Sequence, residues 1–182
     1  MPHFRIERLM AEVGAAEANR EGPFGGGIHL SLTHHEDPFM LFVYGKVRSE
    51  ELAAWGWDDS TSASFIEMQY KMQQRSYETN YPESKLYTVS VQGIPAGKLH
   101  VADGAEAVTL IDIALLPEYQ GQGIGTAMLR GLQRYGQEAR KPLRLTTNVG
   151  SRASRLYERL GFRILEANEV VVRMEWTEQP IH

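Results

Sequence analysis

Apolar residues recur at two different periods along this chain, and each period predicts a different kind of element. Ile28, Leu30 and Leu32 alternate with polar residues, which is typical of a strand with one buried face. A glycine-containing turn at 93–97 is expected to join two further strands as a hairpin. The expected strands after the first are 85–91, 98–102, 108–115, 143–147, 162–165 and 170–176.

Apolar positions three or four residues apart predict the helices. The expected helices span 38–47, 60–80, 125–139 and 151–160, with a separate helical turn at 49–54. One face of the helix at 60–80 is expected to carry Phe65, Met68 and Met72. The inward face of the helix at 125–139 is expected to carry Met128, Leu132 and Tyr135. This order of elements predicts an α/β fold with a mixed sheet, because hairpins make neighbours antiparallel and helical crossovers make them parallel.

Length and composition narrow the class of protein. A chain of 182 residues is long enough to bury one substantial core. We expect a single domain at 28–177, a mobile N-terminal arm with a glycine-rich joint at 1–27, and a short tail at 178–182. The arm carries a loose helical stripe, so the alternative is that it packs on a partner subunit. A net charge of −4 argues against a nucleic-acid partner and is compatible with a cationic substrate.

The absence of cysteine excludes thiol nucleophiles, disulfides and thiolate metal sites. It fits the reducing cytoplasm, where we expect the protein to act. No apolar run reaches membrane-spanning length, so no membrane partner is expected. His34 and His35 have no evident third ligand, and we expect a solvated loop pair and no metal site.

The most informative segment joins the apolar strand at 108–115 to the helix at 125–139. The connecting segment contains three glycines at alternate positions, Gly121, Gly123 and Gly125, which predict a turn. Such a turn points several backbone N–H groups and the positive end of a helix dipole at one spot, which suits a phosphate or pyrophosphate. It is neither a P-loop nor a dinucleotide fingerprint, because Thr126 and Ala127 follow where those motifs need other residues. We expect Glu118, just before the turn, to be solvated.

The turn reads QGQGIG and follows LLPEY, and in this form it resembles the acetyl-CoA signature of the GNAT superfamily of N-acetyltransferases. The segment ASRLYERLGF at 153–162 is similar to the helix after the fifth strand of that family. The resemblance covers roughly residues 28–176 in element order. It implies a central sheet of six to seven strands flanked by about four helices, with the fourth and fifth strands splayed apart. Residues 65–82 look like a bacterial subgroup of unknown substrate.

The resemblance also implies a binding site for acetyl-CoA as co-substrate. Backbone amides at 120–125 would cradle the pyrophosphate, and the pantetheine arm would pair with the main chain near Leu115. An amide in the Ala114–Leu115 region would polarise the thioester carbonyl, and Tyr157 would protonate the departing thiolate. The residues implied to contact coenzyme A are Ala114, Leu115, Leu116, Gln120, Gly121, Gln122, Gly123, Ile124, Gly125, Thr126, Asn148, Ser151, Ser154 and Tyr157.

One position departs from the family pattern. The family often has asparagine six or seven residues before the tyrosine, where this chain has Ser151 and Gly150. Asn148 lies slightly further upstream. Ser151 either replaces the asparagine contact or serves as the N-cap of the following helix.

Other residues have two interpretations each. Asp112 interrupts an apolar strand on the face of Leu110 and Ala114. It is therefore a catalytic base, a hydrogen-bonded structural acid, or an acid exposed where two strands splay apart. Tyr157 is either the general acid or a core aromatic. Trp55, Trp57, Tyr77 and Tyr81 either line an amine pocket through cation–π contacts or pack as core or lid residues.

These observations predict an N-acetyltransferase that moves an acetyl group from acetyl-CoA to a primary amine of a small molecule or peptide, by direct attack in a ternary complex. One alternative is a non-catalytic acyl-CoA sensor or regulatory module of the same fold. A third is a scaffold organised by the N-terminal arm. A homodimer is compatible with the family, and the acceptor is not identified.

Overall fold

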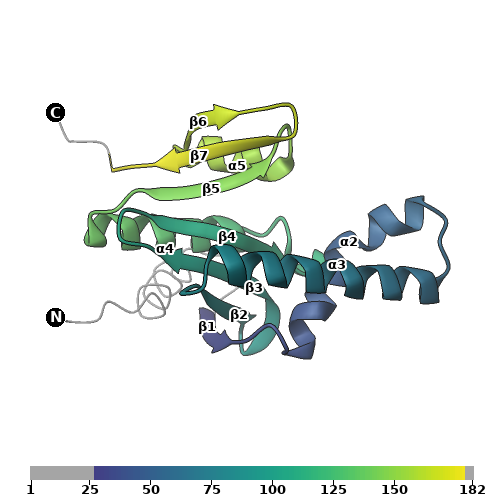
Figure 1. Cartoon of the computed structure of the whole chain (residues 1–182). Coiled ribbons are helices and arrows are strands. Elements are labelled where there is room, and N and C mark those ends of the chain that lie inside the picture. Colours follow the sequence, from purple (N-terminus) through teal and green to yellow (C-terminus); the bar gives the residue numbers. More distant parts are fainter. Residues whose placement is uncertain (1–26, 179–182) are drawn as a thin grey trace.

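The computed structural model describes residues 27–178 (Figure 1). The arm expected at 1–27 and the tail expected at 178–182 lie outside this range except for Gly27 and Glu178. The described elements, in order, are β1 (Ile28–Thr33), α2 (Pro38–Ala54), α3 (Asp59–Asn80), β2 (Lys85–Val91), β3 (Ile94–Asp103), β4 (Val108–Leu115), the 3-10 turn η1 (Pro117–Tyr119), α4 (Ile124–Ala139), β5 (Leu143–Asn148), α5 (Arg152–Arg159), β6 (Arg163–Ala167) and β7 (Val171–Trp176).

The predicted α/β class and mixed sheet are confirmed. Within the described residues, seven strands form one sheet in the order β1-β2-β3-β4-β5-β7-β6, accompanied by four α-helices. The pair β4 and β5 is parallel, and the other neighbours are antiparallel.

The sheet opens between β4 and β5. Their pairing runs from Val108 with Leu143 to Leu110 with Leu145 and ends there in the described structure. The two strands nevertheless continue to Leu115 and Asn148. Their C-terminal halves therefore separate, as the resemblance implied, and Figure 1 shows the gap.

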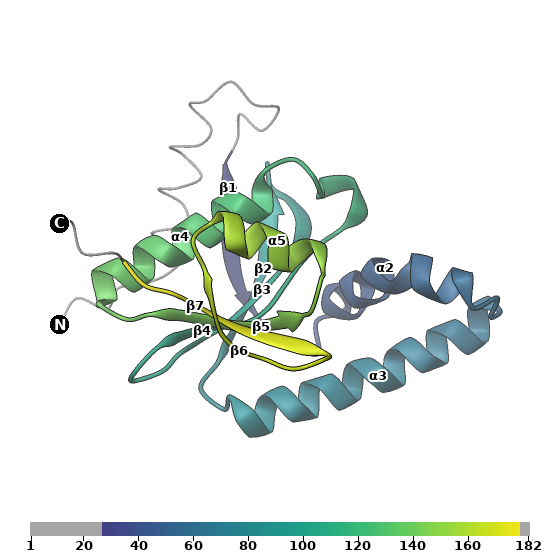
Figure 2. The ribbon, with the colours of Figure 1, turned by 90° about the horizontal axis from the view of Figure 1, so that it is seen from above.

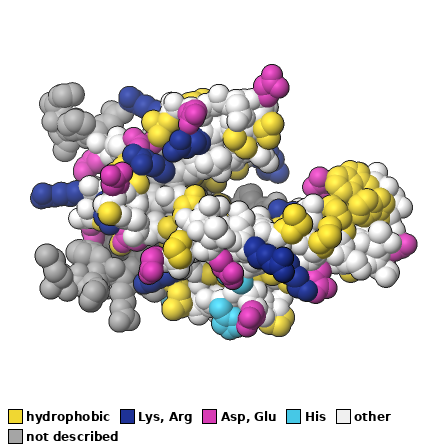
Figure 3. Space-filling model, in the orientation of Figure 1, with side chains coloured by type: hydrophobic (Ala, Val, Ile, Leu, Met, Phe, Trp, Pro, Cys, Tyr) yellow, Lys and Arg dark blue, Asp and Glu magenta, His cyan; other side chains and the backbone are white. Residues whose placement is uncertain are grey.

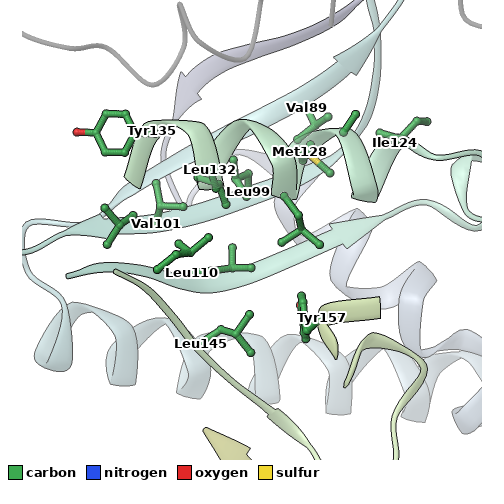
Figure 4. Close-up of a cluster of buried hydrophobic side chains, with 14 of the residues drawn as sticks. Val89, Leu99, Val101, Leu110, Ile124, Met128, Leu132, Tyr135, Leu145 and Tyr157 are labelled. Atoms are coloured by element: carbon green, nitrogen blue, oxygen red, sulfur yellow. The ribbon is translucent and has the colours of Figure 1, made fainter. Parts of the chain in front are cut away.

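Helices lie on both faces of the sheet (Figure 2). The main core lies between the sheet and the helices α4 and α5, and it contains Leu99, Leu110, Met128, Leu132 and Tyr157 (Figure 4). A smaller cluster beneath the other face joins Met40 and Tyr44 of α2 to Tyr70 of α3 and Leu86 of β2. The inward positions predicted for α4 are confirmed, because Met128, Leu132 and Tyr135 are all buried.

An extra residue in β4 changes which face its side chains occupy. His100 is paired with Asp112, but Val101 is paired with Leu110, so Ile111 is left over as a β-bulge. Leu110 lies in the main core, whereas Asp112 lies opposite His100 beside α2 and α3. The expectation that Asp112 shares the face of Leu110 is therefore wrong, because strict alternation fails at a bulge.

The first two helices differ from the prediction in extent and in orientation. The segment expected as two pieces is one helix, α2, which begins at the Asp37 cap, whose Oδ1 accepts from Phe39 N at 3.0 Å. In α3 the buried residues are Tyr70 and Gln74, while Met68 and Met72 are 53% and 62% exposed. Of the three residues predicted on that face, Met68 and Met72 therefore lie at the surface, while Phe65 packs against two tryptophans.

The hairpin between β2 and β3 is tighter than expected. Gln92 and Gly93 have φ values of 52° and 77°, so the turn lies there and β3 begins at Ile94. Gly97, expected in the turn, is instead a strand residue. A Cβ atom at Gly97 would meet the Ala114 carbonyl oxygen at 2.2 Å, so only glycine lets β3 approach the end of β4 this closely.

Candidate functional site

The loop after β4 is braced by its own glutamines. Gln120 Nε2 donates to the Leu115 carbonyl at 2.9 Å, and Gln122 Nε2 donates to the Glu118 carbonyl at 2.7 Å. Leu116 N donates to the Ala96 carbonyl at 2.8 Å, which fixes the end of β4 to β3. Glu118 is exposed in η1, as expected. These bonds leave the following glycine segment at the surface.

The glycine segment ends in an open helix N-terminus. Gly121 and Gly123 have φ values of 73° and 84°, which glycine adopts without strain. The first intrahelical bond runs from Ala127 N to Gly123 O, so the N–H groups of Ile124, Gly125 and Thr126 precede it and point outward.

Space for a ligand exists above this N-terminus. Apart from its chain neighbours and the backbone of its own helix, a Cβ atom at Gly121, Gly123 or Gly125 would meet no described atom within 4 Å. The side chain of Ile124, which is 2% exposed, anchors the segment in the core. Outward N–H groups, a helix dipole and an empty approach together fit a phosphate or pyrophosphate group.

The splay adjoins this loop. Leu115 is opposite Gly97 and Ala114 is opposite Lys98, so one edge of β4 is occupied by β3 up to its end. The edge toward β5 has no strand partner after Leu110 in the described structure. Apart from the Leu115 carbonyl, which accepts from Gln120, main-chain groups of residues 111–115 on that edge are thus available to an extended ligand lying in the gap.

Tyr157 is held in the core by α5. The side chain is 5% exposed, and its ring centroid lies 5.6 Å from that of Phe162. In Figure 4, Leu110 lies between the α4 residues Met128 and Leu132 and the pair Leu145 and Tyr157. Burial, followed by the negative charge of Asp112, raises the pKa of Tyr157 to about 12. The phenol therefore keeps its proton at neutral pH.

The start of α5 answers the question about Ser151. Ser151 Oγ accepts from Ser154 N at 3.0 Å, so Ser151 is the N-cap. Ser154 is buried and donates from its hydroxyl to the Ser151 carbonyl at 2.8 Å. Asn148 ends β5 with an exposed side chain. All three residues stay predicted contacts for coenzyme A.

Asp112 is paired in the structure. Its Oδ2 lies 2.8 Å from Lys98 Nζ, and the two side chains are 25% and 6% exposed. Lys98 Nζ is also 5.6 Å from the ring centroid of Tyr44. The carboxylate therefore has its countercharge inside the protein, while part of its surface remains accessible from the outside. Its role as a base stays a prediction.

A small cavity adjoins Asp112 on the side of α2 and α3. Its lining consists of His35, Met40, Tyr70, Gln74, Tyr77, Leu86, Lys98, His100 and Asp112. His100 is 2% exposed, and Ser84 Oγ lies 2.7 Å from its Nε2. Burial is the main cause that lowers the pKa of His100 to about 4, so the ring is neutral at pH 7.

Sequence reasoning missed most of this polar cluster. Lys98 and His100 lie in β3, and no local sequence pattern links these two residues to Asp112 in β4. Of the histidine pair, His34 is exposed as expected, but His35 is not a solvated loop residue. The His35 ring stands edge-on to His100 at 5.1 Å, and its carbonyl accepts from Tyr70 Oη at 2.7 Å.

The four aromatic candidates for an amine pocket separate into two groups. Tyr77 lines the cavity with its ring 5.1 Å from His100, and burial raises its pKa. Tyr81 caps α3 one turn later, with its N–H donating to the Tyr77 carbonyl. Trp55 and Trp57 lie between α2 and α3 against Phe65, and neither lines the cavity.

Over 27–178, no group of three or more histidine, aspartate or glutamate side chains is arranged to hold a metal ion. No helix in the same range combines the length and apolar character needed to cross a membrane.

A domain model and several solved structures are similar to this chain. Residues 82–164 match the family model described as the acetyltransferase (GNAT) domain. None of the curated proteins compared with the chain matches it. The structure of PaiA N-acetyltransferase from Thermoplasma acidophilum in complex with coenzyme A is similar with a TM-score of 0.62 and 16% identity, covering 84% of this chain and 99% of that one.

Two further solved structures share the fold. An acetyltransferase from Thermus thermophilus has a TM-score of 0.59 and 17% identity over 83% of this chain and 97% of that one. The ribosomal L7/L12 alpha-N-protein acetyltransferase RimL, in complex with coenzyme A, has a TM-score of 0.54 and 17% identity over 85% and 96%. Residues 82–164 are therefore similar to the acetyltransferase (GNAT) domain, and the described structure shares the fold of these acetyltransferases.

Proposed function

We propose that this protein transfers an acetyl group from acetyl-CoA to a primary amine of a small molecule or peptide. The match to the GNAT domain model supports acetyl transfer in general. The observation that carries the proposal is the open N-terminus of α4 beside the splay, with the buried phenol of Tyr157 on the adjoining helix. Coenzyme A bound to similar proteins supports the same donor here.

The donor would be held mainly by main-chain groups. N–H groups of residues 121–126 would bind the pyrophosphate, because the Gln120 N–H already donates to the Pro117 carbonyl. The free edge of β4 would pair with the pantetheine arm. An N–H in the Ala114–Leu115 region would donate to the thioester oxygen as negative charge develops there. Asn148, Ser151 and Ser154 would flank the bound donor at the start of α5.

The acceptor amine must lose a proton, and the thiolate must gain one. Deprotonating a lysine-like amine of pKa about 10.4 at pH 7 costs roughly 4.6 kcal/mol. Asp112, directly or through a water molecule, would accept that proton, and Tyr157 would donate its own to the leaving thiolate. Holding both reactants in one ternary complex supplies the remaining acceleration without a covalent enzyme intermediate.

The donor assignment is tested by titrating the protein with acetyl-CoA in a calorimeter. Gly125→Val places a branched side chain in the open space above the α4 N-terminus, at a residue with ordinary φ. The wild type should bind, and Gly125→Val should show no measurable heat. Ser60→Val is the matched control, because Ser60 occupies the same second position of α3 and is exposed. Equal binding by Gly125→Val would contradict the assignment.

Catalysis is tested separately by release of free thiol. The protein is incubated with acetyl-CoA and each of a panel of primary amines. Release of free coenzyme A thiol is expected only when an acceptor amine is present. Binding without amine-dependent release would support the acyl-CoA sensor instead of the transferase.

A further inference from the structure

Arg48 is held rigidly next to the polar cluster around Asp112. It lies within α2, between the two segments that the sequence predicted as a helix at 38–47 and a separate turn at 49–54. Its guanidinium carbon is 3.5 Å from the ring centroid of Tyr44, and Tyr44 is only 3% exposed. Stacking on a buried ring fixes the plane of a guanidinium group and leaves its N–H edges free to face a ligand.

The guanidinium has no carboxylate partner among residues 27–178. Its one hydrogen bond in that range is a long one, from Nη1 to the Tyr44 carbonyl at 3.4 Å. Glu51 is one turn further along α2, and its charge acts on Tyr44, but it forms no ion pair with Arg48 in the described structure. Most of the five N–H donors of this arginine are therefore available.

Arg48 belongs to the same region as Asp112. A chain of contacts joins them: Arg48 stacks on Tyr44, Lys98 Nζ is 5.6 Å from the Tyr44 ring, and Lys98 is 2.8 Å from Asp112. The charges of Arg48 and Asp112 also both act on Tyr77. Arg48 is partly exposed and the Asp112 side chain is 25% exposed, so both can be reached from solvent. Figure 3 shows an indentation of the surface between the hairpin of α2 and α3 and the part built from β5 to β7.

The charges of the cluster indicate which ligand fits. Lys98 already neutralises Asp112, so the pair offers little net attraction to a simple cation. Arg48 is a cation without an ion-pair partner within the described residues, and a planar guanidinium binds carboxylates in bidentate fashion. A ligand that satisfies this region therefore brings its own carboxylate.

We propose that the acceptor carries a carboxylate as well as its amine, and that Arg48 binds the carboxylate while the amine faces Asp112. This inference rests on the proposed function and narrows its substrate class to amino acids and peptides with a nearby carboxyl group. Arg48 is then a specificity-determining residue, because it orients the acceptor without touching the bonds that change.

The test compares pairs of acceptors that differ only in charge. Amino acids with the amine at the α, β or ω position, and dipeptides, are each assayed beside the corresponding primary carboxamide. In the wild type the carboxylate member of at least one pair should have a kcat/KM about 10- to 100-fold above its amide, the range expected for hydrogen bonds to a charged group. Arg48→Gln should remove that advantage through KM, and Arg48→Lys should restore part of it.

Two controls separate this role from a structural one. Lys46→Gln removes an exposed cation of the same helix, whose ammonium group lies over the Phe42 ring. This variant should keep the wild-type preference for carboxylates over amides. Acetyl-CoA binding, measured by calorimetry, should be the same in the wild type and Arg48→Gln. Loss of that binding in Arg48→Gln would mean that the variant is misfolded. In that case, a comparison of carboxylate and amide ligands on the wild-type protein decides the proposal alone.

That comparison needs no turnover. N-acetylated amino acids and their amides are titrated into wild-type protein saturated with coenzyme A. Preferential binding of the carboxylates supports the inference. Equal binding of both, or no binding of either, overturns it. Acetylation of amines irrespective of a carboxylate overturns the inference but leaves the proposed function standing, whereas failure to bind acetyl-CoA removes both.

Discussion

At the scale of single residues, Tyr157 combines burial with a place beside the opened sheet. The surrounding core keeps its phenol neutral, since burial and the charge of Asp112 raise its pKa to about 12. A phenol that holds its proton up to this pH is a donor over the whole physiological range. Ionisation of Tyr157 is therefore not expected to lower the rate between pH 7 and pH 10.

Tyr157→Phe removes that proton donor and little else. General acid catalysis contributes about 10²- to 10⁴-fold, so kcat should fall within that range while the Kd for acetyl-CoA changes little. Tyr135→Phe is the control, because Tyr135 is a buried tyrosine that donates to Asp103 at the opposite end of α4. Unaltered turnover in Tyr157→Phe would leave the tyrosine with a packing role only.

His100 predicts a pH dependence of stability. Its pKa is about 4 in the folded protein against 6.5 for the ordinary side chain, so the unfolded chain binds the proton more readily. The resulting stability is present above pH 6.5 and is lost as the pH falls toward 4, on the order of 3 kcal/mol.

Urea denaturation between pH 4 and pH 7 checks this dependence. The free energy of unfolding of the wild type should decline as the solution becomes acidic, and His100→Gln should flatten that slope. His34→Gln, which changes an exposed histidine, should keep the wild-type slope. Parallel slopes for wild type and His100→Gln would show that His100 does not titrate as described.

At the scale of elements, the end of β4 depends on how closely β3 approaches it. Gly97→Ala places a Cβ atom 2.2 Å from the Ala114 carbonyl, and the strands must separate to admit it. Overpacking of this kind costs about 1–3 kcal/mol, and here it also displaces the main chain expected to polarise the thioester. Both stability and turnover should therefore fall.

Gly45→Ala provides a control with the opposite sign. The added Cβ would be 3.6 Å from the Ile66 side chain, which is ordinary contact, and alanine is favoured over glycine within a helix by roughly 1 kcal/mol. Thermal denaturation should give a melting temperature equal to or above that of the wild type. A Gly97→Ala protein as stable as Gly45→Ala would contradict the close approach of β3 to β4.

At the scale of the whole molecule, the elements follow from sequence wherever local pattern determines them. The alternation at 85–91 and the apolar run at 108–115 define β2 and β4 without correction, and the glycine turn predicts the α4 N-terminus. Contacts between distant segments were not predictable. The pair Lys98–Asp112 joins two strands whose relative register depends on a bulge, and no periodicity reports that bulge.

The exposed face of α3 has a similar explanation. Met68 and Met72 have helical spacing, yet the sheet is contacted through Tyr70 and Gln74, which border a polar cavity. Hydrophobic spacing locates a buried face only when the surface it meets is itself apolar. Here that surface carries Lys98, His100 and Asp112, so the rule selects the wrong side.

The extra residue Ile111 has a consequence for how such an enzyme can diversify. It moves Asp112 to the face opposite that of Leu110, beside α2 and α3, while Ile113 and Leu115 beyond it still pack against the main core. Under the proposed function, changes in α2 and α3 are expected to alter the choice of acceptor while the glycine segment after β4 keeps its sequence. A single inserted position thus places the acidic side chain of β4 and its core side chains on opposite faces of the sheet.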